Sequence, residues 1–570
     1  MPDSAAGGDS PVGLGDVISD PTSRPAGESL RYSIAAVSDR KWLQTPLHEH
    51  AGEHSASAKD TRAGLLAGFL HCESVREALE MWLGVDRFAE LMHQPVRLCI
   101  EQLQSDIAMI DRLLNAQLNR ILHHERFQKL EASWRGLQYL QECREDYGDA
   151  DGMVKIQVLN IKWLELRSDL DNGEEIDQSH LFRKIHDECF GQAGGTPFAA
   201  IVADFDIHPN LTQQYSVDDL AIVRGLSQIG AAAFCPIILN AHPSMLGLND
   251  FSELRHTINI EALHNGLEFF QWKKFRESPD SRFVALTLPR MLMRTPYKGR
   301  GKAIFPFEEK VSSASDYLWG GASFGMGEVL MRAFAKFGWC ASIRGTGAYG
   351  LEEGQGSAVA DFARSRQRRT GTSDLRSLMG RGGLVTGCAV DEFRTESPGL
   401  ATKPLTEVWL SEPLERELAK AGFLALCACR DTPLAAFYSS VTVQKPKAYE
   451  TEEATQNAKL SSLLNQLMCV SRFAHFIKAI AREKIGSGIE GEALEQYLQR
   501  WLVDYITPDS DASDDQKREK PLREGQVKIV TLPGKAGEYN CIIELLPHYE
   551  LDDILASMRF RTRLIRMAAT

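Results

Sequence analysis

The longest helical periodicity in the chain lies between residues 95 and 140. After Pro95, apolar side chains three or four residues apart form a seam of Val96, Ile100, Leu103, Ile107, Ile110, Leu114, Leu118 and Ile121. This spacing predicts an amphipathic helix of about seven turns. A second stripe within 126–140 contains Phe127, Leu130, Trp134, Leu137 and Leu140. The seam needs a partner helix, from this chain or another subunit. The second stripe indicates a core helix, and Trp134 beside Gly136 suggests a ring packed where a backbone approaches.

A shorter amphipathic helix is predicted at 62–83. Its stripe consists of Val75, Leu79, Trp82 and Leu83, Ser74 and Glu77 have the spacing of a capping box, and Gly84 would end it. Residues 1–60 are rich in Gly, Pro, Ser, Ala and Asp and lack periodicity, so we expect a disordered arm. A helix behind such an arm is either a docking peptide or a helix lying on its own domain.

Beyond residue 150 the pattern alternates between strands and helices. Strands are predicted at 153–161, 197–204 and 232–240, with a helix at 217–231, which indicates a mixed α/β fold with a partly parallel sheet. The C-terminal part predicts a solvated loop at 508–520 and strands at 527–532, 539–546 and 558–565. In the last strand Met558, Phe560 and Leu564 alternate with arginines, as in a half-buried strand.

These changes of pattern suggest five segments. They are a disordered arm (1–60), an N-terminal helical region (61–150), an α/β core (151–345), an exposed Gly- and Arg-containing insertion (346–381) and a second domain ending in strands (382–570).

Composition narrows the class of protein. The 570 residues carry a net charge of −13, which argues against a nucleic-acid partner. No apolar run is long enough for a membrane span, and the N-terminus lacks a secretory signal. The eleven cysteines contain no Cys-x-x-Cys pair. We therefore expect reduced, mostly buried thiols and a cytoplasmic location.

Candidate chemistry is sparse, and we expect neither a metal nor another cofactor. Gly321-Ala322-Ser323-Phe324-Gly325 matches a nucleophile elbow, so a hydrolase using Ser323 is one alternative, and an ordinary helix start is the other. His123 and His124 would lie on different faces of a helix and would not converge on one metal. His475, between two phenylalanines, is expected to be a core histidine, and the lysines around Pro446 indicate either a contact loop or a solvated turn.

Ordered blocks of the sequence resemble the large subunit (TssC) of the type VI secretion contractile sheath. They include FQKLEASWRGLQYL (127–140), FGQAGGTPFAAIVADFDI, FRESPDSRFVALTLPRMLMRTPY, YLWGGASFGMGEVLMRAFAKFGWCASIRG, AAFYSSVTVQKPKAYE and CVSRFAHFIKAIAREKIG. The resemblance covers roughly residues 95–570, with 346–381 departing from the family pattern.

The resemblance implies a bacterial structural protein and not an enzyme. It implies a heterodimer with the small subunit (TssB), polymerisation into a helical sheath around an inner tube of Hcp rings, attachment to a baseplate, contraction, and disassembly by the AAA+ ATPase ClpV. A sheath paralogue that does not polymerise is a further alternative. The partner-binding residues expected on this basis are Leu79, Trp82, Leu83, Ile107, Leu114, Phe127, Trp134, Met558, Phe560 and Leu564.

Overall fold

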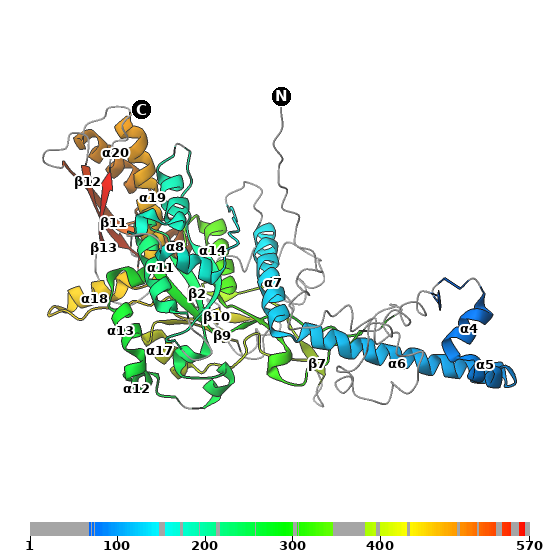
Figure 1. Cartoon of the computed structure of the whole chain (residues 1–570). Coiled ribbons are helices and arrows are strands. Elements are labelled where there is room, and N and C mark those ends of the chain that lie inside the picture. Colours follow the sequence, from blue (N-terminus) through cyan, green and yellow to red (C-terminus); the bar gives the residue numbers. More distant parts are fainter. Residues whose placement is uncertain are drawn as a thin grey trace, which may run out of the picture. The chain divides into compact units, whose positions relative to one another are not determined.

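A computed structural model gives the fold (Figure 1). It describes residues 68–69, 71–72, 74–147, 154–171, 175–192, 194–211, 217–256, 258–299, 305, 307–345, 382–394, 400–429, 434–486, 491–509, 512–531, 539–548 and 558–564. The predicted arm (1–60) and insertion (346–381) lie outside these residues. The chain divides into a first unit, residues 1–129 with 296–317, and a second unit, residues 130–295 with 318–570.

The first unit is helical in its described part. Helices α4 (Val75–Leu83) and α5 (Val85–Met92) precede the long α6 (Val96–Leu122), and the first turn of α7 (Glu125–Asp146) completes the run. Gly84 separates α4 from α5 with φ 80°, a conformation that glycine adopts without strain. The predicted end of the first helix is therefore confirmed. The capping box is wrong, because the Ser74 side chain makes no cap hydrogen bond.

Helix α6 ends at Leu122, and α7 begins only at Glu125. His123 and His124 therefore lie at a break between two helices, and their predicted placement on one continuous helix is wrong. Residues 296–317 belong to the same unit, and their described part contains the 3-10 turn Ala314–Asp316.

The second unit is built on a mixed sheet. Among the described strands, six follow the order β1-β2-β3-β9-β10-β6. Strands β1 (Ile201–Ile207), β2 (Ile237–Ala241), β3 (Val284–Leu288) and β9 (Phe423–Ala428) are parallel. Strands β10 (Ala435–Phe437) and β6 (Leu384–Val385) continue the sheet antiparallel. The predicted mixed α/β class is confirmed.

Helices cover both faces of this sheet. Successive residues of a strand point to opposite faces, so apolar side chains on both faces pack against helices. Ile237 and Leu239 pack in the cluster that contains α11 (Asp219–Ala233) and α13 (Phe270–Arg276). Ile238 packs on the opposite face with α14 (Ser323–Phe337) and with Tyr139 and Leu140 of α7. Both faces are apolar, so the parallel strands read as continuous apolar runs in the sequence.

The remaining elements of the second unit are short strand pairs and helices. Strands β4 (Met291–Arg294) and β5 (Leu318–Gly320) pair, as do β7 (Glu392–Arg394) and β8 (Leu400–Thr402). The other helices of four turns or fewer are α8 (Trp163–Asp171), α9 (His180–Phe182), α10 (Glu188–Phe190), α12 (Ile260–His264), α17 (Glu412–Lys420) and α18 (Glu452–Ser461).

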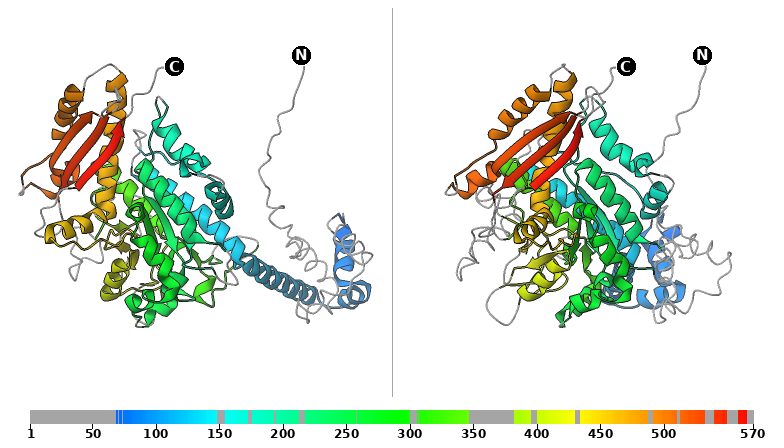
Figure 2. Two further views of the ribbon diagram at one scale, coloured as in Figure 1. Left: turned by 60° about the vertical axis from the view of Figure 1, so that its left-hand side comes forward. Right: turned by 90° about the vertical axis from the view of Figure 1, so that its left-hand side faces the viewer.

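The C-terminal part forms a sheet of its own. In the described chain its strands run β11 (Leu522–Thr531), β12 (Tyr539–Pro547), β13 (Met558–Leu564), all antiparallel. Helices α19 (Leu464–Gly486) and α20 (Gly491–Val503) lie on one face of this sheet (Figure 2). Leu494, Leu498 and Leu502 of α20 are fully buried there, together with Val527, Ile543 and Leu545 of the strands.

Two local predictions are wrong. The strand predicted at 153–161 is absent from its described part, residues 154–161, although their sequence is rich in β-branched residues. The predicted loop at 508–520 contains the helix α21 (Asp514–Glu519), whose start Ser513 and Gln516 cap. The stretch at Trp339–Cys340 is irregular, and Trp339 stacks on Phe473.

Candidate interaction surfaces

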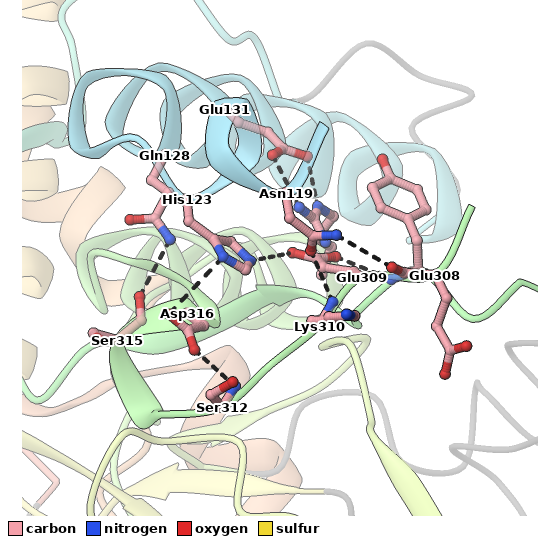
Figure 3. Close-up of polar contacts among 12 residues, drawn as sticks. Asn119, His123, Gln128, Glu131, Glu308, Glu309, Lys310, Ser312, Ser315 and Asp316 are labelled. Carbon is pink, nitrogen blue, oxygen red and sulfur yellow. Dashed lines mark hydrogen bonds and ion pairs between the residues drawn. The ribbon is translucent and has the colours of Figure 1, made fainter. Parts of the chain in front are cut away.

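Two amide side chains fix the end of α6. Asn115 and Asn119 lie one turn apart on this helix, and both bond to the backbone of residues 308–310. Figure 3 shows the contacts of Asn119. Asn115 accepts from the Glu308 N–H (3.0 Å), and Asn119 accepts from the Lys310 N–H (2.8 Å). These residues lie beside the apolar seam. The sequence analysis did not single them out, although two Asn spaced i,i+4 beside a seam are a signal for such contacts.

His123, at the helix break, faces two carboxylates of the same unit (Figure 3). Its Nε2 lies 3.3 Å from Glu309 Oε1, and its Nδ1 lies 3.9 Å from Asp316 Oδ1. Burial raises the pKa of Asp316, but the Ser313 and Ser312 N–H groups and the nearby imidazole together hold that pKa below its ordinary value. Glu309 also accepts from the Tyr297 N–H (3.0 Å), so this corner is a structural polar cluster.

Trp82 packs against α6 through a specific polar contact. Its indole Nε1 donates to Asp106 Oδ2 (3.2 Å), and Gln102 donates to the other oxygen of Asp106 (2.9 Å). The Phe69 ring lies 5.3 Å from the Trp82 ring, centroid to centroid. Leu79 and Leu83 are half-buried beside it. The predicted docking residues of α4 therefore lie on a helix of their own unit.

The apolar seam of α6 is only partly covered by the described chain. Val96 is 74% exposed, Ile100 49% and Ile107 56%. Leu114, closer to the Asn115–Asn119 contacts, is half-buried. The N-terminal half of the seam is thus an exposed apolar surface on a long helix.

The two candidate residues within 126–140 differ in their exposure to solvent. Phe127 is half-buried, whereas the Trp134 ring is 67% exposed. The close approach predicted for Trp134 occurs at Gly136, where a Cβ would clash with the Phe324 ring. The expectation that Trp134 packs in the interior is therefore wrong. Glu131 on the same helix forms a buried ion pair with Arg294 (2.7 Å).

The C-terminal strand pairs within its own chain. β13 joins β12 over seven residues, from Tyr539 opposite Leu564 to Leu545 opposite Met558. The backbone register is thus defined, whereas the side chains of Met558, Phe560 and Leu564 lie outside the described ones.

Ser323 has no geometry for catalysis. It is fully buried at the first turn of α14, its N–H donates to Asn240 Oδ1 (3.1 Å), and its hydroxyl donates to the Ala203 carbonyl (3.4 Å). Close packing explains the glycines of the motif, because a Cβ on Gly321 would clash with Asn240 and one on Gly325 would press on Met291. The hydrolase alternative lacks an accessible nucleophile.

The remaining candidate groups are structural. His475 bonds to the Ala233 carbonyl (2.9 Å), and burial lowers its pKa to about 4, which confirms a core histidine. All eleven cysteines are free and eight are buried. In the described ranges, no cluster of three His, Cys, Asp or Glu could hold a metal ion. Within the same ranges, every helix is too short or too polar to cross a membrane.

Two family models match the chain. The EvpB/VC_A0108 tail sheath N-terminal domain matches residues 104–444, and the EvpB/VC_A0108 tail sheath gpW/gp25-like domain matches residues 453–564. The matches define the class as tail sheath proteins, which is a class of structural proteins and not a known enzyme family.

A curated relative narrows this class. The chain is 33% identical over 503 residues to the type VI secretion system sheath protein TssC1 of Pseudomonas aeruginosa, an alignment that covers 86% of this chain and 92% of that protein. The chain therefore belongs to the TssC/VipB family of type VI secretion sheath proteins, as its resemblance suggested.

Proposed function

We propose that this protein pairs with a small sheath subunit and polymerises around an inner tube of Hcp-like rings in the bacterial cytoplasm. The sheath contracts to propel the tube from a baseplate, and a ClpV-like AAA+ ATPase recycles it. The protein performs mechanical work, because its lattice interfaces repack between two states. The sheath must grow through head-to-tail contacts, because two-fold contacts would close the assembly.

The observation that carries this proposal is the exposed half of the α6 seam. Val96, Ile100 and Ile107 present one apolar stripe, and their side chains are at least half exposed or close to it. Apolar side chains in a regular stripe on a long helix are typical of a helix–helix interface. A helix of the small subunit is the partner that the family suggests.

Co-purification with the small subunit tests the interface. Replacing Ile107 with Asp together with Leu114→Asp would place two charges in the seam, at a cost of roughly several kcal/mol of binding free energy. We expect loss of the complex on size exclusion. The matched control, Gln104→Asp with Ser105→Asp, adds the same charge at exposed polar positions of α6 and should leave the complex intact. Retention of the partner by the seam variant at wild-type level would reject the interface.

Two further contacts complete the proposal. Helix α4 with Leu79, Trp82 and Leu83 is the site for the recycling ATPase, and Phe127 and Trp134 contribute to subunit contacts. The strand β13 joins neighbouring subunits, supported by its position at an edge of the described sheet. Backbone pairing of this kind adds a strand to an existing sheet.

A further inference from the structure

Side chains of α20 occupy the outer edge of β11. Gln499 Nε2 donates to the Gly525 carbonyl (3.0 Å), and Gln499 Oε1 accepts from the Val527 N–H (2.9 Å). One turn earlier on the helix, Glu495 Oε2 accepts from the Ile529 N–H (2.7 Å). These three backbone groups are those that an additional strand would use, because alternate residues of an edge strand point their polar groups outward.

The geometry of the two elements makes this contact regular. Residues four apart on a helix are separated by about 6 Å along its axis, and residues two apart on a strand by about 6.6 Å. Glu495 and Gln499 therefore match Ile529 and Val527 in step. The Gln499 amide engages the carbonyl of residue 525 and the N–H of residue 527, as a residue of a parallel strand opposite Gln526 would do.

Burial fixes the helix in this position. Leu494 and Leu498, which directly precede Glu495 and Gln499, are fully buried on the sheet, and so is Leu502 in the next turn. A Cβ on Gly525 would lie 2.8 Å from Leu502 Cδ2, so glycine permits the close approach. A groove of about 970 Å³ between α20 and β11 includes Glu495, Gln499 and Val527 in its lining. Solvent therefore reaches this edge, and side-chain hydrogen bonds block strand pairing there.

We infer that Glu495 and Gln499 close the β11 edge against strand addition and thereby direct an incoming extended segment of another chain to the β13 edge. The strand order makes β13 the other edge of the described sheet. The inference that another chain adds at the β13 edge rests on the proposed sheath assembly. The closed β11 edge is a property of this chain alone. A sheet with one usable edge specifies a single lattice contact and limits indiscriminate β-association.

Amide exchange and oligomer size test the closed edge. In the complex with the small subunit, Glu495→Ala with Gln499→Ala should make the Val527 and Ile529 amides exchange about tenfold faster, because their acceptors are lost. Light scattering below the assembly threshold should show larger species that grow with concentration. Gln496→Ala is the matched control, since Gln496 is exposed in the same groove and its side chain bonds to none of the described β11 residues. It should behave as wild type.

The outcomes separate the two proposals. Unchanged exchange and size in the double variant would overturn the closed edge, as would rapid exchange of both amides in the wild type. If the double variant fails to fold, Gln499→Met keeps a side chain of similar length but loses the acceptor for the Val527 N–H. It should still accelerate exchange of the Val527 amide, and wild-type exchange would overturn the inference. Failure of the wild-type pair to form sheaths would reject the proposed function but leave the amide result standing.

Discussion

Single buried amides join segments that are distant in the sequence. Asn119 lies beside the apolar seam, is 9% exposed, and bonds to the backbone of residues 308–310. Asn240 similarly receives the N–H of Ser323 and the hydroxyl of Thr287 (3.0 Å). Each amide satisfies backbone or hydroxyl groups that would otherwise be buried without a partner.

Partly buried histidines make the second unit sensitive to acid. Burial lowers the pKa of His475 and of His242 from 6.5 to about 4, so the unfolded chain binds more protons between these values. The free energy of unfolding should therefore fall as pH drops from about 6.5 to about 4. His475→Gln keeps a donor for the Ala233 carbonyl without titrating.

Urea unfolding at a series of pH values measures this effect. The His475→Gln variant should lose less stability than wild type over the same interval. His180→Gln, at an exposed position, is the control and should follow the wild-type pH dependence. Identical slopes for wild type and His475→Gln would show that His475 does not contribute.

At the scale of elements, the α4–α5 pair is attached to α6 by few contacts. Trp82 reaches Asp106, Arg87 reaches Gln102 (3.2 Å), and Phe88 is the one buried apolar residue among the described positions of the pair. Few buried contacts imply a low free energy of local opening. A low free energy of opening supports the proposal that α4 leaves α6 and binds the ATPase.

Removal of this element separates recycling from assembly. Deletion of residues 60–84 should leave sheath assembly and contraction intact, because α6 keeps its seam and its Asn119 contacts. Contracted sheaths should persist when the purified ATPase and ATP are added, as seen by electron microscopy and sedimentation. Disassembly at the wild-type rate would place the ATPase site elsewhere.

At the scale of the whole molecule, the proposal is that β13 connects neighbouring copies into a lattice. β13 pairs with β12 in antiparallel register across seven residues, and residues 549–557, which the structure does not describe, separate it from His548. In the proposed lattice, the outer edge of β13 accepts an extended segment of a neighbouring chain, which would link the subunits head to tail.

Truncation after Leu555 tests this connection. The truncated chain should still pair with the small subunit, because the α6 seam is unchanged, but tubes should be absent under assembly conditions. Phe560→Pro should act in the same direction by removing a ladder N–H, whereas Thr562→Val keeps the backbone and should assemble. Sheaths of ordinary length from the truncated pair, seen by negative-stain microscopy, would contradict the connector role.

The sequence by itself determined the elements whose periodicity is long or whose burial is two-sided. The α6 seam, the strands near 201–207 and 237–241 and the C-terminal strands were predicted from local pattern, because burial imposes a fixed spacing on apolar residues. Family membership was equally visible, since it depends on residues in order along the chain. The sequence analysis missed the break between α6 and α7. The spacing of apolar residues does not indicate that amide side chains near the end of α6 bond to residues 308–310.

Tertiary structure alone decided which surfaces are free. Trp134 is exposed and Gly136 is buried because Phe324, nearly two hundred residues away, occupies the space beside α7. Residues 154–162 have a strand-like sequence but no strand, because pairing needs a neighbour that local propensity does not supply. The closed edge of β11 likewise depends on α20 lying beside it with Gln499 in step, a relation between two elements that no single stretch of sequence encodes.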